Sequence, residues 1–205
     1  MRDIIIVGAG SVGGHIASNA EEYGIADQII GFLDDDPQKQ HTEFCGFPVI
    51  SNLNWLHARS DLSVILGIAF PRIKKKIYDQ YLQQTNFHYP TLIHPRAWMS
   101  EDCSIGSGSI IYPNTSVNFK SEIGEFCVLN MNCAVGHNAK IGNFSSLAPG
   151  VSLGGHTTIE DQVDMGIGSS TLQNVCIGSG SIIGGQSMVI NSFPQESKIK
   201  GVPAK

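Results

Sequence analysis

Residues 121–147 read SEIGEFCVLNMNCAVGHNAKIGNFSSL, and an apolar residue recurs in them at every sixth position: Ile123, Leu129, Val135, Ile141 and Leu147. This apolar ladder continues without an insertion from Ile93 to Val189, and Thr171 is the one polar residue among its seventeen members. A second series, the small ladder, lies four residues behind it and contains only small side chains, among them Ser121 and Cys127. Positions four residues apart on a strand face the same side, so both ladders can point into one core.

The period of six selects the fold class. A helix repeats about every 3.6 residues and a plain strand every two, so neither fits. A hexapeptide β-helix does fit, because each coil joins three short faces at tight corners. A series of independent hairpins would not keep two ladders in phase over this length. Five to six coils, with strands about 4.8 Å apart, give a prism roughly 25 Å tall.

The first ninety residues have a different pattern. Ile4 to Val7 is an apolar run typical of a buried strand, and it enters the turn Gly8–Gly14, which contains a GxGxxG motif. We expect a helix over residues 15–23 and a strand over residues 28–33 that ends at Asp34. The glycines can simply form a tight turn. The order of strand, turn, helix and acid, however, is typical of a phosphate-binding fingerprint.

The sequence therefore predicts two domains. Residues 1–90 would form a small Rossmann-like parallel sheet that binds a nucleotide, and residues 91–205 would form the parallel β-helix. Ninety residues are too few for two mononucleotide-binding halves and a substrate domain, which argues against a dehydrogenase. A nucleotide carried by the substrate explains the glycine turn better.

Two histidines, His137 and His156, lie between the inward-facing positions of the repeats and should occupy corners of the prism. One coil of eighteen residues separates His137 from Gly155, so these two should be stacked. An imidazole base beside a free backbone N–H is suited to acyl transfer, since the base takes a proton and the amide stabilises an oxyanion. The alternative is that both histidines are ordinary exposed corner residues.

A metal site is the competing chemistry for a histidine in such a solenoid. The γ-class carbonic anhydrases hold zinc with three histidines, and their pattern needs a second histidine five residues after the first. Gly142 stands at that position after His137. We therefore expect no metal.

The two halves together resemble a known family, the left-handed β-helix acetyltransferases that act on nucleotide-linked amino sugars, with sialic acid O-acetyltransferases as relatives. The resemblance covers essentially the whole chain. It rests on the segments IIVGAG (5–10), GFLDD (31–35), GHNAKIG (136–142), MGIG (165–168) and GVPAK (201–205). Hexads occur in many acyltransferases, and the small α/β domain before them is the more discriminating feature.

The resemblance implies left-handed coiling and a homotrimer with acetyl-CoA in the cleft between neighbouring solenoids. It also implies that His137 is the general base, that Asn138 lies beside it, and that Gly155 N–H is the oxyanion donor. The residues that would contact acetyl-CoA are Gly155, Ile167 and Gly185. Those that would hold the nucleotide-linked amino sugar are Gly8, Gly10, Asp34 and Asp35.

The sequence departs from the family pattern at two positions. Val12 stands in the glycine turn where the family often has histidine, and Asn138 stands where it commonly has an acid. An amide can orient an imidazole but cannot stabilise imidazolium by charge. O-acetylation of a sialic acid and a non-catalytic sugar-nucleotide scaffold therefore stay open as alternatives.

The net charge limits the classes of partner that the protein is expected to bind. The net charge of −5 argues against a general nucleic-acid or membrane-surface binder. No apolar run reaches the roughly 20 residues of a membrane helix, and the first residues do not resemble a signal peptide. We expect a cytoplasmic protein that binds neither nucleic acid nor membrane.

Overall fold

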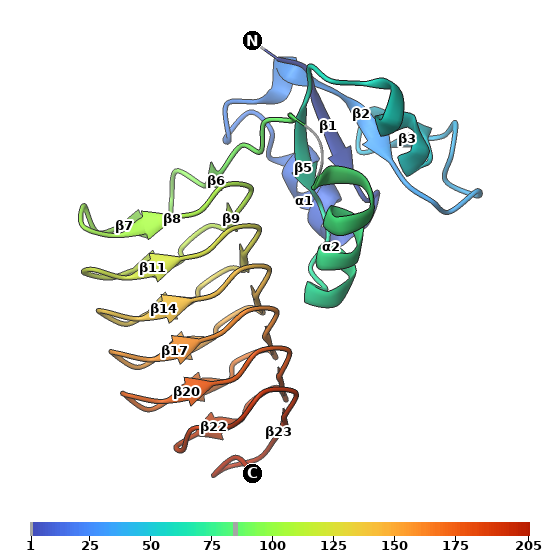
Figure 1. Cartoon of the computed structure of the whole chain (residues 1–205). Helices are drawn as coiled ribbons and strands as arrows, with labels where there is room; N and C mark the ends of the chain where they lie inside the picture. The colour runs from blue at the N-terminus through green and yellow to red at the C-terminus, as the bar shows by residue number, and fades with distance from the viewer. Residues whose placement is uncertain (1, 84–85) are drawn as a thin grey trace. The chain divides into compact units, whose positions relative to one another are not determined.

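The computed structural model describes residues 2–83 and 86–205 of the chain. The chain divides into two compact units (Figure 1). The first runs to residue 90 without residues 70–72, and the second comprises residues 70–72 and 91–205.

The first unit contains a five-stranded sheet in the order β3-β4-β2-β1-β5. Its strands are β1 (Ile4–Val7), β2 (Ile29–Leu33), β3 (Glu43–Phe44), β4 (Phe47–Ser51) and β5 (Ser63–Leu66). The pairs β1–β2, β1–β5 and β2–β4 are parallel, as predicted, but β3 pairs with β4 in the antiparallel direction. Every residue of β1 and β5 is buried, which is expected for apolar strands covered on both faces.

The helical segments of the first ninety residues are short. They are α1 (Ser11–Ser18), η1 (Ala26–Gln28), η2 (Leu53–Ala58), α2 (Pro71–Ile77) and the π-helical turn η3 (Tyr78–Leu82). The predicted helix over residues 15–23 was wrong in its bounds. The helix begins directly after Gly10, whose extended backbone forms the N-cap, and it ends where the Asn19 side chain donates to the His15 carbonyl.

The second unit is a solenoid of two-residue strands in three parallel sheets (Figure 1). The sheet orders are β22-β19-β16-β13-β10-β7, β20-β17-β14-β11-β8 and β23-β21-β18-β15-β12-β9-β6. The strands are β6 (Leu92–Ile93), β7 (Trp98–Met99), β8 (Ser104–Ile105), β9 (Ile110–Ile111), β10 (Ser116–Val117), β11 (Glu122–Ile123), β12 (Val128–Leu129), β13 (Ala134–Val135), β14 (Lys140–Ile141), β15 (Ser146–Leu147), β16 (Ser152–Leu153), β17 (Thr158–Ile159), β18 (Asp164–Met165), β19 (Ser170–Thr171), β20 (Cys176–Ile177), β21 (Ile182–Ile183), β22 (Met188–Val189) and β23 (Lys198–Ile199).

The apolar ladder supplies the second residue of each strand up to β22 and fills the prism, as predicted. Its first member is an exception. Ile93 is 42% exposed, because β6 is the edge strand of its sheet, while the neighbouring Leu92 is buried. Ile93 keeps the register of the ladder, since it pairs with the core residue Ile111, but no coil in the described part of the chain covers it at this end of the prism.

The small ladder is buried beside the apolar one, except for the half-buried Cys103, and most of its hydroxyls are satisfied within the solenoid. Ser109, Thr115 and Ser121 donate to carbonyls fifteen residues further on, at 2.8, 2.7 and 2.7 Å. A buried hydroxyl without such a partner would destabilise the fold, so these bonds explain how polar residues are tolerated in the core.

Corners of the solenoid recur with the same six-residue period, and many contain a non-glycine residue in the left-handed region. Asn138 and His156 occupy equivalent corner positions one coil apart, with φ of 57° each. Asparagine and histidine are among the residues that adopt this conformation most readily. The turn itself thus accounts for the asparagine at position 138 and permits the histidine at position 156.

Within residues 2–83 and 86–205, no helix combines the length and hydropathy needed to cross a bilayer.

Candidate functional site

One corner of the solenoid brings together His137, Asn138, Gly155 and His156, and we call it the His137 corner. It follows β13 and β16, and His137 and His156 are both exposed. Nδ1 of His137 lies 3.1 Å from Oδ1 of Asn138. Because the amide oxygen can only accept, this bond places the proton on Nδ1 and leaves Nε2 with a free lone pair. The imidazole therefore has its unprotonated nitrogen, Nε2, on the side of Gly155.

Gly155 lies directly beside that nitrogen. A Cβ built on Gly155 would be 2.6 Å from His137 Nε2 and 2.8 Å from Cε1. The His156 N–H donates to the His137 carbonyl at 2.9 Å, which fixes the two coils relative to each other. The stacking of Gly155 on His137 thus follows the eighteen-residue coil that the sequence indicated.

The backbone N–H of Gly155 is free to donate. Among residues 2–83 and 86–205, none accepts a hydrogen bond from it. Elsewhere in the solenoid the equivalent corner amides of Phe119 and Met131 are occupied by the side chain of the preceding asparagine, at 2.7 and 2.8 Å. Gly155 follows a glycine, which has no such side chain. An unoccupied N–H beside a base is an arrangement that can stabilise an oxyanion.

Ile167 and Gly185 occupy a different corner, the Ile167 corner. They are stacked one coil apart, since a Cβ on Gly185 would lie 3.2 Å from the Ile167 carbonyl oxygen. Ile167 is 61% exposed. The sheet that contains β13, β16 and β19 lies between this corner and the His137 corner. A single chain therefore does not bring all the predicted acetyl-CoA contacts together.

The glycine turn of the first unit joins β1 to α1. Gly8 has φ of +101°, which a side chain rarely adopts. A Cβ on Gly13 would lie 2.1 Å from the Gly8 carbonyl oxygen, so Gly13 permits close packing of the helix on the turn. Gly10 has no neighbour within 4 Å of its Cβ position. The turn is thus tightly packed at Gly13 and leaves space beside Gly10. A bound phosphate needs such space to approach the backbone.

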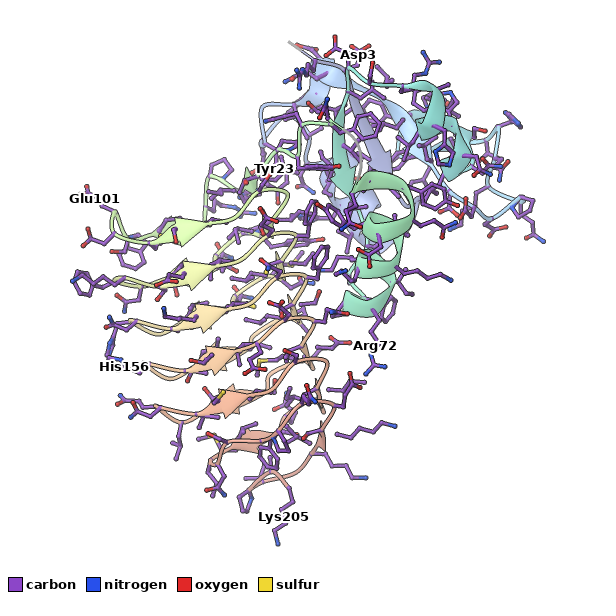
Figure 2. The ribbon with its side chains drawn as sticks, in the orientation of Figure 1. Asp3, Tyr23, Arg72, Glu101, His156 and Lys205 are labelled. Atoms are coloured by element: carbon purple, nitrogen blue, oxygen red, sulfur yellow. The ribbon has the colours of Figure 1, made fainter. Side chains whose placement is uncertain are left out.

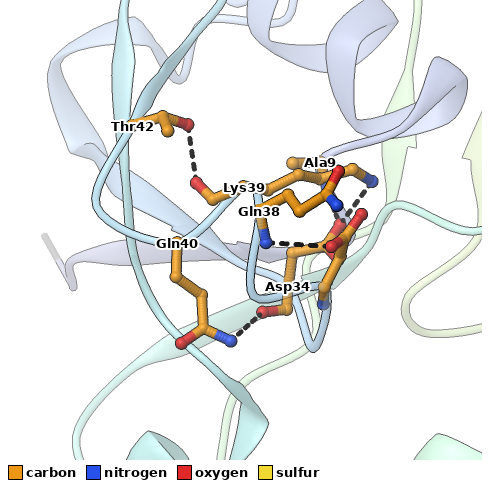
Figure 3. A network of polar contacts seen from close by, with 7 residues as sticks. Ala9, Asp34, Gln38, Lys39, Gln40 and Thr42 are labelled. Atoms are coloured by element: carbon orange, nitrogen blue, oxygen red, sulfur yellow. Dashed lines mark hydrogen bonds and ion pairs between the residues drawn. The ribbon is translucent and has the colours of Figure 1, made fainter.

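Asp34 directly follows β2, and its carboxylate accepts three hydrogen bonds (Figure 3). The donors are the Ala9 N–H at 2.9 Å, the Asp36 N–H at 3.0 Å and Lys39 Nζ at 3.1 Å. Partial burial alone would raise the pKa of Asp34, but these hydrogen bonds and the Lys39 charge outweigh it and lower the pKa below its ordinary value. The carboxylate is therefore held ionised beside the glycine turn.

Asp35, which is also predicted to contact the nucleotide, has a hydrogen-bond partner within the first unit. Asp35 is exposed, and its Oδ1 accepts the Leu53 N–H at 3.0 Å, at the start of η2. Sequence reasoning missed Lys39 and Gln40, which bond the Asp34 side chain and carbonyl respectively. The only signal was their position in the polar stretch that follows the acids.

The described residues, 2–83 and 86–205, contain no group of three or more His, Cys, Asp or Glu side chains that could hold a metal ion.

Comparison with known proteins gives one family model for the first unit and solved structures similar to the whole chain. Residues 3–81 match the family model described as the PglD N-terminal domain. No curated protein matches the chain significantly. Among solved structures, the acetyltransferase domain of PglB from Neisseria gonorrhoeae FA1090 is 27% identical with a TM-score of 0.90, and the match covers 100% of this chain and 99% of that one.

The chain resembles the hexapeptide-repeat sugar N-acetyltransferases along its whole length. WeeI from Acinetobacter baumannii AYE is 25% identical with a TM-score of 0.89, over 100% of this chain and 99% of its own. A histidine-to-asparagine mutant of perosamine N-acetyltransferase from Caulobacter crescentus, in complex with CoA and GDP-perosamine, is also 25% identical. Its TM-score is 0.86, over 99% of this chain and 95% of its own.

These matches confirm two predictions made from the sequence. The fold class is that of the left-handed β-helix sugar N-acetyltransferases, with a small mixed sheet in place of a purely parallel one. The resemblance to acetyl-CoA-dependent enzymes is also confirmed, since the PglB domain has a structure with acetyl coenzyme A.

Proposed function

We propose that the protein transfers the acetyl group of acetyl-CoA to the amino group of a nucleotide-linked amino sugar. The observation that carries this proposal is the His137 corner, with a base and a free amide, in a chain that shares both units with perosamine N-acetyltransferase. That protein binds CoA and GDP-perosamine. The likeness extends over nearly the full length of both chains, so it includes the unit with the glycine turn as well as the solenoid.

The first unit supplies the nucleotide contacts in this proposal. The open side of Gly10 would admit a phosphate to the start of α1, while Gly8 keeps the turn tight. The Ala9 N–H is already bound to Asp34, so the phosphate would use other amides of the turn. Asp35 would contact the ribose or base through Oδ2, because its Oδ1 accepts the Leu53 N–H, and Asp34 would exchange one of its present partners for the same contact.

His137 would act as the general base. Its Nε2 would accept a proton from the sugar amine as the amine nitrogen attacks the thioester carbonyl, and its Nδ1–H would keep donating to Asn138. Gly155 N–H would stabilise the oxyanion of the tetrahedral intermediate. The C–S bond then breaks, and the CoA thiolate leaves and takes the proton from His137. Nothing in this sequence of steps requires a covalent enzyme intermediate.

Acetyl-CoA would lie between subunits. Ile167 and Gly185 are predicted to contact it. The Ile167 corner and the His137 corner, however, lie at opposite ends of the strands of one sheet. We propose a homotrimer of parallel solenoids in which these two kinds of corner from neighbouring subunits form each cleft. The 61% exposure of Ile167 in the single chain is consistent with a contact of this kind. We assign the reaction to the cytoplasm, where acetyl-CoA is available.

The test is CoA thiol release from acetyl-CoA with UDP- and GDP-linked amino sugars and with free sialic acids. We expect turnover with a nucleotide-linked amino sugar, and no turnover with the same amino sugar lacking the nucleotide. Turnover confined to sialic acids would replace the proposal with O-acetylation. A trimer inactive with every acceptor and unable to bind acetyl-CoA would replace it with a scaffold.

A further inference from the structure

His156 places a second imidazole at the His137 corner. The centroids of the two rings are 5.0 Å apart and the ring planes meet at 89°, which is an edge-to-face pair. Figure 2 shows His156 at an outer corner of the solenoid. His156 is exposed and directly follows Gly155 in the sequence. Its ring contacts the ring of His137.

The turn does not require an aromatic ring at position 156. The position needs a residue that adopts the left-handed region, and the chain uses asparagine for this purpose at equivalent positions: Asn114, Asn132, Asn138 and Asn174. Asparagine provides the same turn without a ring. The imidazole of His156 is therefore an addition to what the fold needs at this corner.

His137 depends on few contacts for its orientation. Its side chain is exposed, and the hydrogen bond that fixes it goes to an uncharged amide, Asn138, at 3.1 Å. Gly155 bounds the ring on one side. The edge-to-face contact with His156 supplies the remaining constraint, since aromatic pairs in this geometry attract each other. Without that contact, rotation about the side-chain torsions would move Nε2 away from its position beside Gly155.

We propose that His156 is a positioning residue that holds the His137 imidazole over Gly155 in the orientation needed for proton transfer. This inference rests on the proposed function, which makes His137 the base. It does not place His156 in contact with the substrate. An ordered His137 ring raises kcat because a base contributes only when it lies within hydrogen-bond reach of the proton it removes.

The chain itself offers a matched pair of substitutions. His156→Asn removes the ring and keeps a residue that the solenoid tolerates at this turn position. His156→Phe keeps a ring without nitrogen atoms, and Phe126 and Phe144 already adopt φ of 53° and 61° at equivalent positions. Gln162→Asn, at another corner with φ of 58°, is the control for a change of turn residue alone.

The first readout is steady-state kinetics of the intact protein. We expect His156→Asn to lower kcat about tenfold, which corresponds to about 1.4 kcal/mol, and to leave both KM values within about twofold. His156→Phe should recover most of the activity, and Gln162→Asn should match the wild type. Full kcat in His156→Asn would overturn the proposal. So would a His156→Phe variant as impaired as His156→Asn with a raised KM for the sugar nucleotide, since the imidazole would then act on the substrate.

The second readout is independent of activity. Long-range proton–nitrogen NMR of the ligand-free protein reports the tautomer of each imidazole, and His137→Ala assigns the His137 signals. We expect one tautomer, with the proton on Nδ1, in the wild type and in His156→Phe, and a mixture in His156→Asn. An unchanged His137 spectrum in His156→Asn would overturn the proposal. If the wild type acetylated no sugar nucleotide, the proposed function would fail while this comparison still decided whether His156 orders His137.

Discussion

The imidazole of His137 occupies the volume that a side chain on Gly155 would fill. A Cβ on Gly155 would lie 2.6 Å from Nε2 of His137 and 3.1 Å from its Cδ2. The two residues are one coil apart, and the position of the base depends on the absence of a side chain from the residue stacked on it. Glycine at position 155 thus serves the site as well as the turn.

Replacing Gly155 with alanine should therefore impair catalysis more than folding. The added methyl group meets the flexible end of His137, and the φ of Gly155 is not in the left-handed region. We expect Gly155→Ala to lower kcat about 10²-fold, near the low end for loss of a general base, with a nearly unchanged Tm. Gly154→Ala is the contrasting variant, because its Cβ would lie 2.6 Å from the backbone N of Gln173 and should lower Tm. Wild-type kcat in Gly155→Ala would contradict this account.

The glycine turn offers a similar pair of variants. Gly13→Ala should destabilise the first unit by about 2–3 kcal/mol, because its Cβ would overlap the Gly8 carbonyl oxygen. Gly10→Ala should cost less than about 1 kcal/mol, since its Cβ position is open and only the N-cap preference is lost. We expect Gly10→Ala to raise the KM for the sugar nucleotide about tenfold by obstructing the phosphate. Urea unfolding and steady-state kinetics measure the two effects, and an unchanged KM would argue against phosphate binding at Gly10.

Asp34 should make stability depend on pH. Its pKa is lower in the folded protein than the ordinary value of 3.8, so the folded state binds this proton less tightly than the unfolded state does. The stabilisation is complete above pH 3.8 and is lost as the pH falls through the folded pKa. At pH 7 we expect Asp34→Asn to reduce the free energy of unfolding by about 1–2 kcal/mol, through loss of charge-assisted hydrogen bonds. Urea unfolding at pH 7 and at pH 3 should show the difference from wild type shrinking at the lower pH, and a constant difference would be the contrary result.

Two buried serines of the small ladder should respond in opposite directions to alanine. Ser145 Oγ donates to the Glu160 carbonyl at 2.8 Å and accepts the Val163 N–H at 3.1 Å, so Ser145→Ala should destabilise by about 1–3 kcal/mol. Ser169 Oγ is buried, and none of the residues in 2–83 and 86–205 is its hydrogen-bond partner. Ser169→Ala should therefore leave stability unchanged or raise it by up to about 1 kcal/mol. Thermal unfolding compares the two, and equal losses would show that Ser169 has a partner after all.

The solenoid could be predicted from sequence because its geometry requires a regular spacing of apolar and small residues along the chain. A coil of three hexads fixes which residues are stacked, so the approach of Gly155 to His137 followed from an interval of eighteen. The burial of Ser121 and Cys127 followed in the same way. The exposure of Ile93 did not, since the periodic pattern does not mark the edge strand.

The first unit was harder to predict in detail. The glycine motif assigns Gly13 and Gly14 to the turn and the predicted helix follows them, but α1 includes both because Gly13 packs against Gly8. The Lys39–Asp34 ion pair depends on how the polar loop folds back, for which local sequence carries no periodic signal. The T-shaped contact of His156 depends on side-chain torsions, which position in the hexad does not determine.

The central claim is that His137 is the base of an acetyl transfer to a nucleotide-linked amino sugar. The most direct measurement is kcat for CoA release by His137→Ala beside the wild type, with acetyl-CoA and the preferred sugar nucleotide both saturating. We predict a fall of about 10²–10⁴-fold with an unchanged Tm, as expected for loss of a general base. A kcat within a few-fold of the wild type would contradict the account, and the His137 corner would then not be the site of proton transfer.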